Sequence, residues 1–286
     1  MSTISYGDGS DVGRVRELNE DRYYADSELG LWLVADGMGG HRGGDVASTI
    51  ASATVVEAIR TGRSLSEAIQ LAHDEVLAAG ERGEGAPNMG STIVALRVQH
   101  HRNYEIAWVG DSRAYLWDGQ LHQLSRDHSY VQWLVDRGEI TEEQARKHPK
   151  SNVITQALGV RGQSIRVDCR NGALEQGQKI LLCSDGLNGE VSDTEISKIM
   201  MSDGSEQSLV DRLIETALQR GGRDNVSVLV ISAPSGSLGV ADEDTELLST
   251  QELIFPRFNR RRKRLWLLAF GVCTCVALAL VSLWGW

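Results

Sequence analysis

Apolar residues recur at three- and four-residue steps in three segments of the chain, which is the spacing of an amphipathic helix. The first segment covers about residues 44–60. The second begins at once, with Ser64 as a candidate N-cap and Gly80 near its end, and the third covers about residues 206–220. Because only residues 61–63 separate the first two segments, we expect them to form an antiparallel helical hairpin.

Runs of apolar and β-branched residues predict strands over much of the remaining sequence. The predicted strands cover residues 31–35, 91–98, 104–109, 114–117, 120–124, 179–183 and 225–231. Asp118-Gly119 is typical of a two-residue hairpin turn between two of them. Because the strands follow one another through hairpins and the helices come in blocks, their order indicates an α+β fold with antiparallel sheets, not a doubly wound parallel sheet.

Residues 127–150 interrupt the strands with two short helical patterns, at 130–137 and 141–147. We interpret this segment as an inserted subdomain within a first domain that covers residues 1–234. Two histidines, His128 and His148, lie in or beside the insertion, and the sequence assigns neither of them a role.

The last 22 residues, 265–286, carry no charge. About 20 helical residues at 1.5 Å each span a bilayer core of roughly 30 Å, so this run predicts a single transmembrane helix. Tryptophans near both of its ends suit anchoring at the two membrane interfaces: Trp266, Trp284 and Trp286. The alternative, a buried core helix, is weaker because the run is long and has no polar face.

Two further segments separate the predicted domain from the predicted membrane helix. Residues 235–256 are polar and acidic, which is typical of a flexible tether. Residues 257–264 hold six basic residues and should stay on the cytoplasmic side, so the chain is expected to be anchored by its C-terminal helix with its first domain in the cytoplasm. The basic cluster fits either a stop-transfer flank or contact with anionic lipid head groups.

Charge and cysteine content exclude some classes of protein. The net charge of −10 conceals an asymmetry, since residues 1–256 hold only 23 of the 29 basic residues but all 39 acidic ones, a net charge of −16. A domain of this charge repels the phosphate backbone of nucleic acids. Four cysteines without a Cys-x-x-Cys pair argue against a disulfide framework and favour a reducing compartment. The N-terminus lacks the pattern of a signal peptide.

Acidic residues follow or precede several of the predicted strands. The stretch "LVADG" (33–37) is echoed by "LLCSDG" (181–186), and Asp111 and Asp224 lie at other strand ends. An Asp-Gly pair alone fits a tight turn, and the glycines after Asp36 would also fit a phosphate-binding loop. Carboxylates gathered at one sheet edge would repel one another unless a cation lay among them, and oxygen ligands without cysteine or histidine clusters favour Mg²⁺ or Mn²⁺.

Seven stretches, taken together and in this order, resemble the metal-dependent protein phosphatases of the PP2C type, the PPM family, and in particular its bacterial branch. They are "SDVGRVRELNED" (10–21), "VADGMGGH" (34–41), "GSTIVAL" (90–96), "VGDSRAYL" (109–116), "NVITQALG" (152–159), "LLCSDGL" (181–187) and "GGRDNVSVLV" (221–230). The resemblance covers about residues 5–232. It implies a four-layer αββα sandwich, in which two antiparallel sheets lie between two layers of helices.

The resemblance also implies the residues that bind two Mn²⁺ or Mg²⁺ ions and, as in bacterial relatives, a third. The implied metal ligands are Glu20, Asp36, the Gly37 carbonyl, Asp111, Asp185 and Asp224. Asp36 is expected to bridge two ions, and Asp111 to join Asp185 at the third. Asp21 is expected to support this set, and Asn225 to hold a turn beside it.

Two more residues are implied in catalysis. Arg16 matches the residue that grips the substrate phosphate, and a planar guanidinium suits this task because it can hold two phosphate oxygens at once. His41 is the only histidine in the motifs and a candidate general acid. Animal relatives carry histidine directly after this Asp-Gly, where this chain has Met38, so a metal-bound water is the alternative acid.

The function implied by the resemblance is hydrolysis of phosphoserine and phosphothreonine in proteins by direct attack of a water that two metals activate. Phosphorylated proteins would be the substrates, and a Ser/Thr protein kinase the natural counterpart. A catalytically silent module that binds phosphoproteins is one alternative, although the chain retains the acids that an inactive relative would lose. A two-metal phosphodiesterase or nuclease is another, and the negative charge of the domain disfavours it.

Overall fold

The computed structural model describes residues 4–40, 43–99, 102–162 and 164–233 of the chain. These residues belong to one compact unit, Met1–Ser237, and the second unit is Leu238–Trp286. The predicted basic cluster (257–264) and membrane helix (265–286), like the predicted tether (235–256), lie outside the described residues. Among the helices that the structure does describe, none has both the length and the apolar character needed to cross a membrane.

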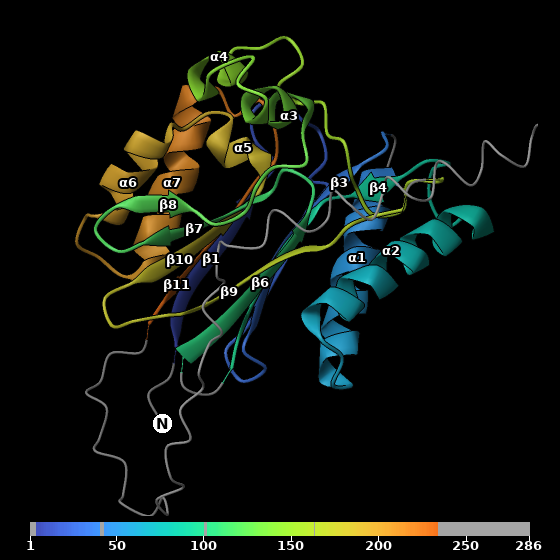
Figure 1. Cartoon of the computed structure of the whole chain (residues 1–286), viewed down its shortest axis with the longest axis horizontal. Helices are drawn as coiled ribbons and strands as arrows, with labels where there is room; N and C mark the ends of the chain where they lie inside the picture. Colours follow the sequence, from blue (N-terminus) through green and yellow to red (C-terminus); the bar gives the residue numbers. More distant parts are fainter. Residues whose placement is uncertain (1–3, 41–42, 100–101, 163, 234–286) are drawn as a thin grey trace, which may run out of the picture. The chain divides into compact units, whose positions relative to one another are not determined.

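Two antiparallel sheets form the centre of the first unit (Figure 1). The first sheet has the order β1-β11-β10-β7-β8, with the bounds Ser5–Asp11, Val226–Ser232, Lys179–Cys183, Arg113–Trp117 and Leu121–Gln123. The second sheet has the order β2-β3-β5-β6-β9, with the bounds Asp21–Asp26, Leu31–Met38, Ile93–Val98, Asn103–Val109 and Asp168–Ala173. The short strand β4 (Gly90–Ser91) also pairs with β3.

Helices cover the outer face of each sheet (Figure 1). Two of them, α1 (Gly43–Arg60) and α2 (Leu65–Arg82), pack on the second sheet. The first sheet is covered by α5 (Asp185–Asn188), α6 (Asp193–Met200) and α7 (Glu206–Arg220). The helices α3 (Tyr130–Asp136) and α4 (Glu142–Arg146) lie in the predicted insertion. The prediction of two antiparallel sheets between helical layers is therefore confirmed.

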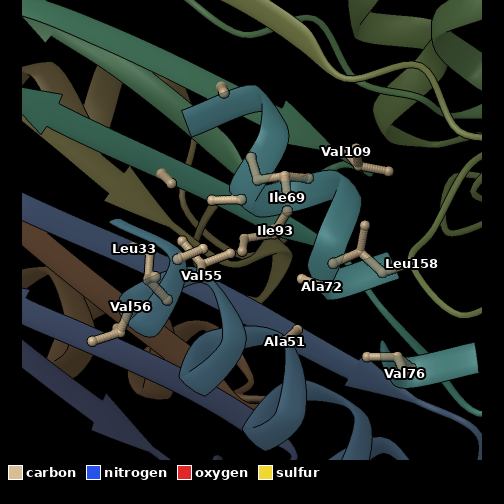
Figure 2. Close-up of a cluster of buried hydrophobic side chains, with 14 of the residues drawn as sticks. Leu33, Ala51, Val55, Val56, Ile69, Ala72, Val76, Ile93, Val109 and Leu158 are labelled. Carbon is tan, nitrogen blue, oxygen red and sulfur yellow. The ribbon is translucent and has the colours of Figure 1, made fainter. Parts of the chain in front are cut away.

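The central strands are buried on both faces, because successive side chains of a strand point to opposite sides of the sheet. In β3, Leu33 packs with α1 and α2, whereas Trp32 and Val34 pack between the two sheets. Figure 2 shows the first of these cores, in which Leu33 and Ile93 of the second sheet meet side chains of α1 and α2. A strand with two buried faces needs no polar side, which explains the continuous apolar runs in the sequence.

The second helix of the hairpin on the second sheet has the predicted start, and it ends near Gly80 as predicted. Ser64 and Glu67 form a capping box, in which the Ser64 hydroxyl accepts a bond from the Glu67 N–H and the Glu67 carboxylate accepts one from the Ser64 N–H. The helix continues past Gly80 to Arg82, and Gly83 ends it with a left-handed φ of 77°. A residue without Cβ adopts this conformation at little cost, so the next glycine, not Gly80, ends the helix.

Three strands have no counterpart in the sequence predictions: β1, β2 and β9. Polar residues or glycine occupy half or more of the positions in each strand, so the apolar signal of a strand is weak. They are strands because each pairs along its length with a strongly apolar neighbour, β11, β3 or β6.

The predicted strand at 91–98 is divided at Thr92, whose N–H donates to the Asp36 carbonyl (2.8 Å). The hairpin after Trp117 has a loop of three residues, because Trp117 pairs with Leu121.

The core between the two sheets predicts how the unit responds to a cavity. Leu182 of β10 has no exposed surface and packs in this core. Replacing Leu182 with Ala should lower the free energy of unfolding by about 2–5 kcal/mol, because the removed atoms leave a space that the sheets close only in part. Urea denaturation of both proteins measures this loss. Leu71→Ala is the matched control, since Leu71 is 43% exposed and its truncation should change stability little. Equal losses in the two variants would contradict the assignment of the core.

Candidate metal centre

Acidic residues from both sheets gather at strand ends. Asp21 begins β2 and lies directly opposite Asp36, near the end of β3. Asp185 follows β10 and Asp224 precedes β11, and because these strands are antiparallel neighbours, the two acids lie at the same end of the first sheet. Asp111 lies in the turn between β6 and β7.

Asp21 connects the two sheets at this end. Its carboxylate accepts hydrogen bonds from the hydroxyls of Ser184 (2.7 Å) and Ser227 (2.8 Å), which belong to the first sheet and its extension, while Asp21 itself lies in the second. The residue is only 3% exposed. These bonds bring the acids of β2 and β3 to those beside β10 and β11, so the predicted supporting role of Asp21 has a clear geometric basis.

Asn225 fixes the loop that carries Arg16 and Glu20. Its amide donates hydrogen bonds to the carbonyl oxygens of Val12 and Leu18, both at 2.9 Å, and its carbonyl oxygen accepts one from the Glu20 N–H at 2.8 Å. One buried side chain therefore satisfies three backbone groups along this loop. The loop before β2 is held to the start of β11 by these bonds.

Glu20 lies where three backbone segments approach one another closely. The Glu20 carbonyl accepts hydrogen bonds from the Gly37 N–H (3.2 Å) and from the Ser48 hydroxyl (2.5 Å). A Cβ on Gly37 would lie 2.0 Å from the Gly44 carbonyl oxygen, and a Cβ on Gly44 would lie 2.7 Å from Glu20 Oε1. Only glycine fits at these two positions, so Gly37 and Gly44 allow β3, α1 and Glu20 to approach one another closely.

Arg16 is paired with one of the predicted metal ligands. Its Nη2 donates to Asp224 Oδ2 at 2.7 Å, and its side chain is 54% exposed. The hydrogen bond that Arg16 donates to Asp224, and the negative charge of this carboxylate, raise the pKa of Arg16. An exposed guanidinium beside the acids can reach a phosphate without leaving the site.

Burial and mutual repulsion disfavour ionisation of the acids. Burial raises the pKa of Asp36 well above its usual range, and the charges of Asp21, Asp185 and Asp111 raise it further. Burial also raises the pKa of Asp111, again with help from Asp185. Like charges in a poorly solvated site can ionise together only if something positive offsets them.

The other two acids of the cluster follow the same pattern. Burial raises the pKa of Asp21 to about 7, although the hydrogen bonds from Ser184 and Ser227 offset part of this effect. Burial and the charge of Asp224 raise the pKa of Asp185 to about 6, while a hydrogen bond with Asp36 lowers it. A cation between these carboxylates would offset the charges that raise both pKa values.

The donor set fits a hard divalent cation. Three buried carboxylate oxygens have no hydrogen-bond partner: Glu20 Oε1, Asp21 Oδ1 and Asp185 Oδ1. Carboxylate and carbonyl oxygens are the ligands that Mg²⁺ and Mn²⁺ prefer. Within the described ranges, no three His, Cys, Asp or Glu side chains converge closely enough to hold an ion as they stand. Asp224 Oδ2 is instead bonded to Arg16.

A cleft of about 450 Å³ adjoins the acids. Asp111, Asp185 and Asp224 form part of its lining, together with residues of α3, α4, α5, the start of α6 and the neighbouring strands and loops. Arg146 of α4 pairs with Asp193 at 2.9 Å, so the insertion is tied to α6 on the far side of the cleft. The cleft gives a substrate group access to the acids.

The structure thus brings together the predicted site residues that it describes, and one predicted residue lies outside the described part of the chain. The residues gathered at this end are Arg16, Glu20, Asp21, Asp36, Gly37, Asp111, Asp185, Asp224 and Asn225. His41 lies outside the described residues, so its role as general acid stays a prediction.

Sequence reasoning missed the hydroxyl groups that hold the acids. Thr92 Oγ1 accepts a hydrogen bond from the Asp36 N–H (3.2 Å) and shares one with Ser112 Oγ (2.7 Å), so it links the Asp36 strand to the Asp111 turn. Ser184 and Ser227 hold Asp21 in the same way. All four residues lie within the motif stretches, but the sequence gives none of them a partner.

Comparison with known proteins identifies the family. A family model described as protein phosphatase 2C matches residues 9–225. The serine/threonine phosphatase stp of Listeria monocytogenes serotype 4b (strain F2365) is 37% identical over 236 residues, which cover 78% of this chain and 93% of that protein. The crystal structure of the Mycobacterium tuberculosis serine/threonine phosphatase PstP/Ppp is 36% identical with a TM-score of 0.74, covering 80% of this chain and 98% of that one.

A further solved structure contains metal. The catalytic domain of the serine threonine protein phosphatase PstP in complex with two manganese ions is 34% identical with a TM-score of 0.72, covering 80% of this chain and 98% of that one. The chain belongs to the protein phosphatase 2C family. The resemblance stated from the motifs and the assignment as a phosphatase are confirmed, and the manganese ions of the PstP structure confirm the predicted divalent cofactor at the level of the family.

Asn225 offers a test of how the site is held. Replacing Asn225 with Ala leaves three part-buried backbone groups without their partner and should lower the free energy of unfolding by about 1–3 kcal/mol. Phosphatase activity on an aryl phosphate should fall by more than about tenfold, because Arg16 and Glu20 lose their fixed loop. Asn171→Ala, at an exposed position of β9, is the matched control. Full activity of the Asn225 variant would contradict the role given to this side chain.

Proposed function

We propose that this protein is a serine/threonine phosphoprotein phosphatase that uses Mn²⁺ or Mg²⁺. The cations would be held by the ligands that the motifs imply: Glu20, Asp36, the Gly37 carbonyl, Asp111, Asp185 and Asp224. The observation that carries the proposal is the convergence of Asp36, Asp111 and Asp185, whose pKa values are raised by burial and by one another's charge, beside a cleft that Asp111 and Asp185 help to line.

The chain's own residues orient the phosphate and shape its surroundings. When bound, two divalent cations would lower the pKa of a water molecule and offset the negative charge of a phosphate monoester. Arg16 is free to exchange its bond with Asp224 for a bidentate grip on two phosphate oxygens, since its side chain is half exposed. Asn225 and Asp21 keep Arg16, Glu20 and Asp36 in register for that contact.

We propose that water attacks the phosphorus directly, without a covalent phosphoenzyme intermediate. The acids that line the cleft are better suited to holding cations than to attacking a phosphate dianion, which repels carboxylates. Hydrolysis by direct attack of water is therefore the proposed course. The proton for the leaving serine or threonine oxygen would come from His41 or from water, and this choice remains a prediction.

Two alternatives have less support. The first is a catalytically silent module that binds phosphoproteins. Such a module would not need the residues of catalysis, whereas this chain has Arg16 and all the acids in place. A phosphodiesterase or nuclease would have to approach a polyanion with a domain whose net charge is −16 over residues 1–256. A protein substrate, and with it a Ser/Thr protein kinase as counterpart, fits this charge better.

The membrane anchor is a second part of the proposal. Its support is the uncharged run 265–286, which is long enough for a bilayer, and the basic cluster 257–264 before it. The phosphatase would then act at the cytoplasmic face of the inner membrane, on substrates that reach this surface. The acidic composition of residues 235–256 suits a tether between the two.

Metal removal and loss of one acid test the catalytic proposal. Hydrolysis of an aryl phosphate and of a phosphothreonine peptide should require added Mn²⁺ and should cease with EDTA. Asp36→Asn should reduce kcat by more than about 100-fold, since a lost ligand costs more than a lost supporting partner. The exposed Asp203→Asn is the matched control and should retain wild-type activity. Activity that survives EDTA or Asp36→Asn would exclude the proposed mechanism.

Deletion of residues 257–286 tests the anchor. The full chain should sediment with the membrane fraction and resist extraction by salt, whereas the truncated chain should stay in the supernatant. Both should hydrolyse the phosphothreonine peptide at similar rates, because the predicted catalytic domain ends at residue 234. The anchor is wrong if the truncated chain still sediments with membranes.

A further inference from the structure

His128 is a buried histidine to which neither the motifs nor the proposed mechanism assigns a role. It is 7% exposed and lies at the start of the insertion. It exchanges two hydrogen bonds with Gly110, the residue before Asp111: the His128 N–H donates to the Gly110 carbonyl (2.8 Å), and the Gly110 N–H donates to His128 Nδ1 (3.1 Å). Both peptide groups of Gly110 are thus held by one residue.

The second ring nitrogen of His128 fixes the tautomer. Nε2 lies 3.3 Å from Asp168 Oδ2, and Asp168 also accepts a hydrogen bond from Arg166 (2.9 Å). Although burial opposes it, the bonds from Arg166 and His128 lower the pKa of Asp168, which keeps this carboxylate an acceptor. Because Nδ1 accepts from Gly110, the proton belongs on Nε2, where it is donated to Asp168.

The Gly110 backbone has little freedom to adopt another conformation. Its φ of 111° favours glycine, and a Cβ there would lie 2.6 Å from Thr92 Cβ. On the other side of Asp111, Ser112 Oγ is bonded to Thr92 Oγ1 (2.7 Å), which in turn accepts the Asp36 N–H. Asp111 is therefore held on one side by His128 and on the other by the Thr92–Ser112 pair.

We propose that His128 is a positioning residue, whose Nδ1 holds the Gly110–Asp111 turn so that the Asp111 carboxylate is presented for binding a divalent cation. The inference rests on the proposed role of Asp111 as a cation ligand. The imidazole does not touch the cation or the substrate. It acts through the Gly110 N–H, as the hydrogen-bond partners behind metal ligands commonly do.

Two substitutions separate the two bonds of the ring. In His128→Asn the amide oxygen can take the place of Nδ1 and accept the Gly110 N–H, but it cannot reach Asp168. In His128→Gln the longer side chain can place its amide nitrogen near Asp168, but it leaves the Gly110 N–H without an acceptor. The matched control is the same pair of changes at His122 of β8. This side chain is exposed, and its Nε2 lies 3.1 Å from Asp118.

The experiment measures Mn²⁺ binding to the full-length chain by isothermal titration calorimetry, with Asp111→Asn as reference for the ion that Asp111 binds. His128→Gln should weaken the binding of the same Mn²⁺ ion by about tenfold or more, because the loss of a partner that supports a metal ligand usually lowers metal affinity by this much. His128→Asn should stay within about threefold of the wild type. In aryl phosphate hydrolysis, excess Mn²⁺ should restore kcat in His128→Gln while KM remains unchanged.

The inference is overturned if the Asn and Gln variants at position 128 weaken Mn²⁺ equally, if neither does, or if excess Mn²⁺ fails to restore kcat. Should His128→Gln not fold, Ser112→Ala tests the same turn from its other side, and unchanged Mn²⁺ binding would refute the account. If Asp111→Asn binds Mn²⁺ as the wild type does, the proposed role of Asp111 fails instead. If the wild-type chain lacks phosphatase activity, the proposed function itself fails.

Discussion

Repulsion between buried carboxylates is the constraint on which the rest of the site depends. Asp21, Asp36, Asp111 and Asp185 all have pKa values raised above their usual range, and in each case burial is the largest cause. Such a group of acids is unfavourable by itself, because each charge makes the next harder to form. Bound cations would offset this repulsion, and the same closely held carboxylates would then bind the cations tightly. The many hydrogen bonds around the acids hold them in place for this.

The fold supplies the rigidity that these acids need. Two sheets packed face to face, with helices outside them, give three apolar layers, and the acids lie at strand ends of both sheets. Strands that are buried on both faces move little, so residues at their ends are held more precisely than residues on long loops. The loop before β2 is held to the start of β11 by three hydrogen bonds of the Asn225 side chain.

Much of this arrangement could be predicted from the sequence where the signal was local. Asp36 and Asp185 each follow an apolar run and precede a glycine, and the capping box at Ser64 lies within four residues. The contacts that assemble the site are not local. The hydroxyl of Ser227 meets Asp21 across 206 positions of the sequence, and no pattern in one chain gives that distance. The polar strands β1, β2 and β9 were missed for the same reason, since their neighbours in the sheet define them.

The central claim is that divalent cations complete the acidic cluster. Diffraction from crystals grown with Mn²⁺, recorded at the manganese absorption edge, tests it most directly, because the anomalous signal locates each ion without reference to activity. The account predicts peaks within about 2.0–2.4 Å of oxygens of Asp36, Asp185 and Asp224, with Arg16 released from Asp224. Ordered manganese elsewhere, or an acidic cluster that keeps its present hydrogen bonds at saturating Mn²⁺, would contradict it.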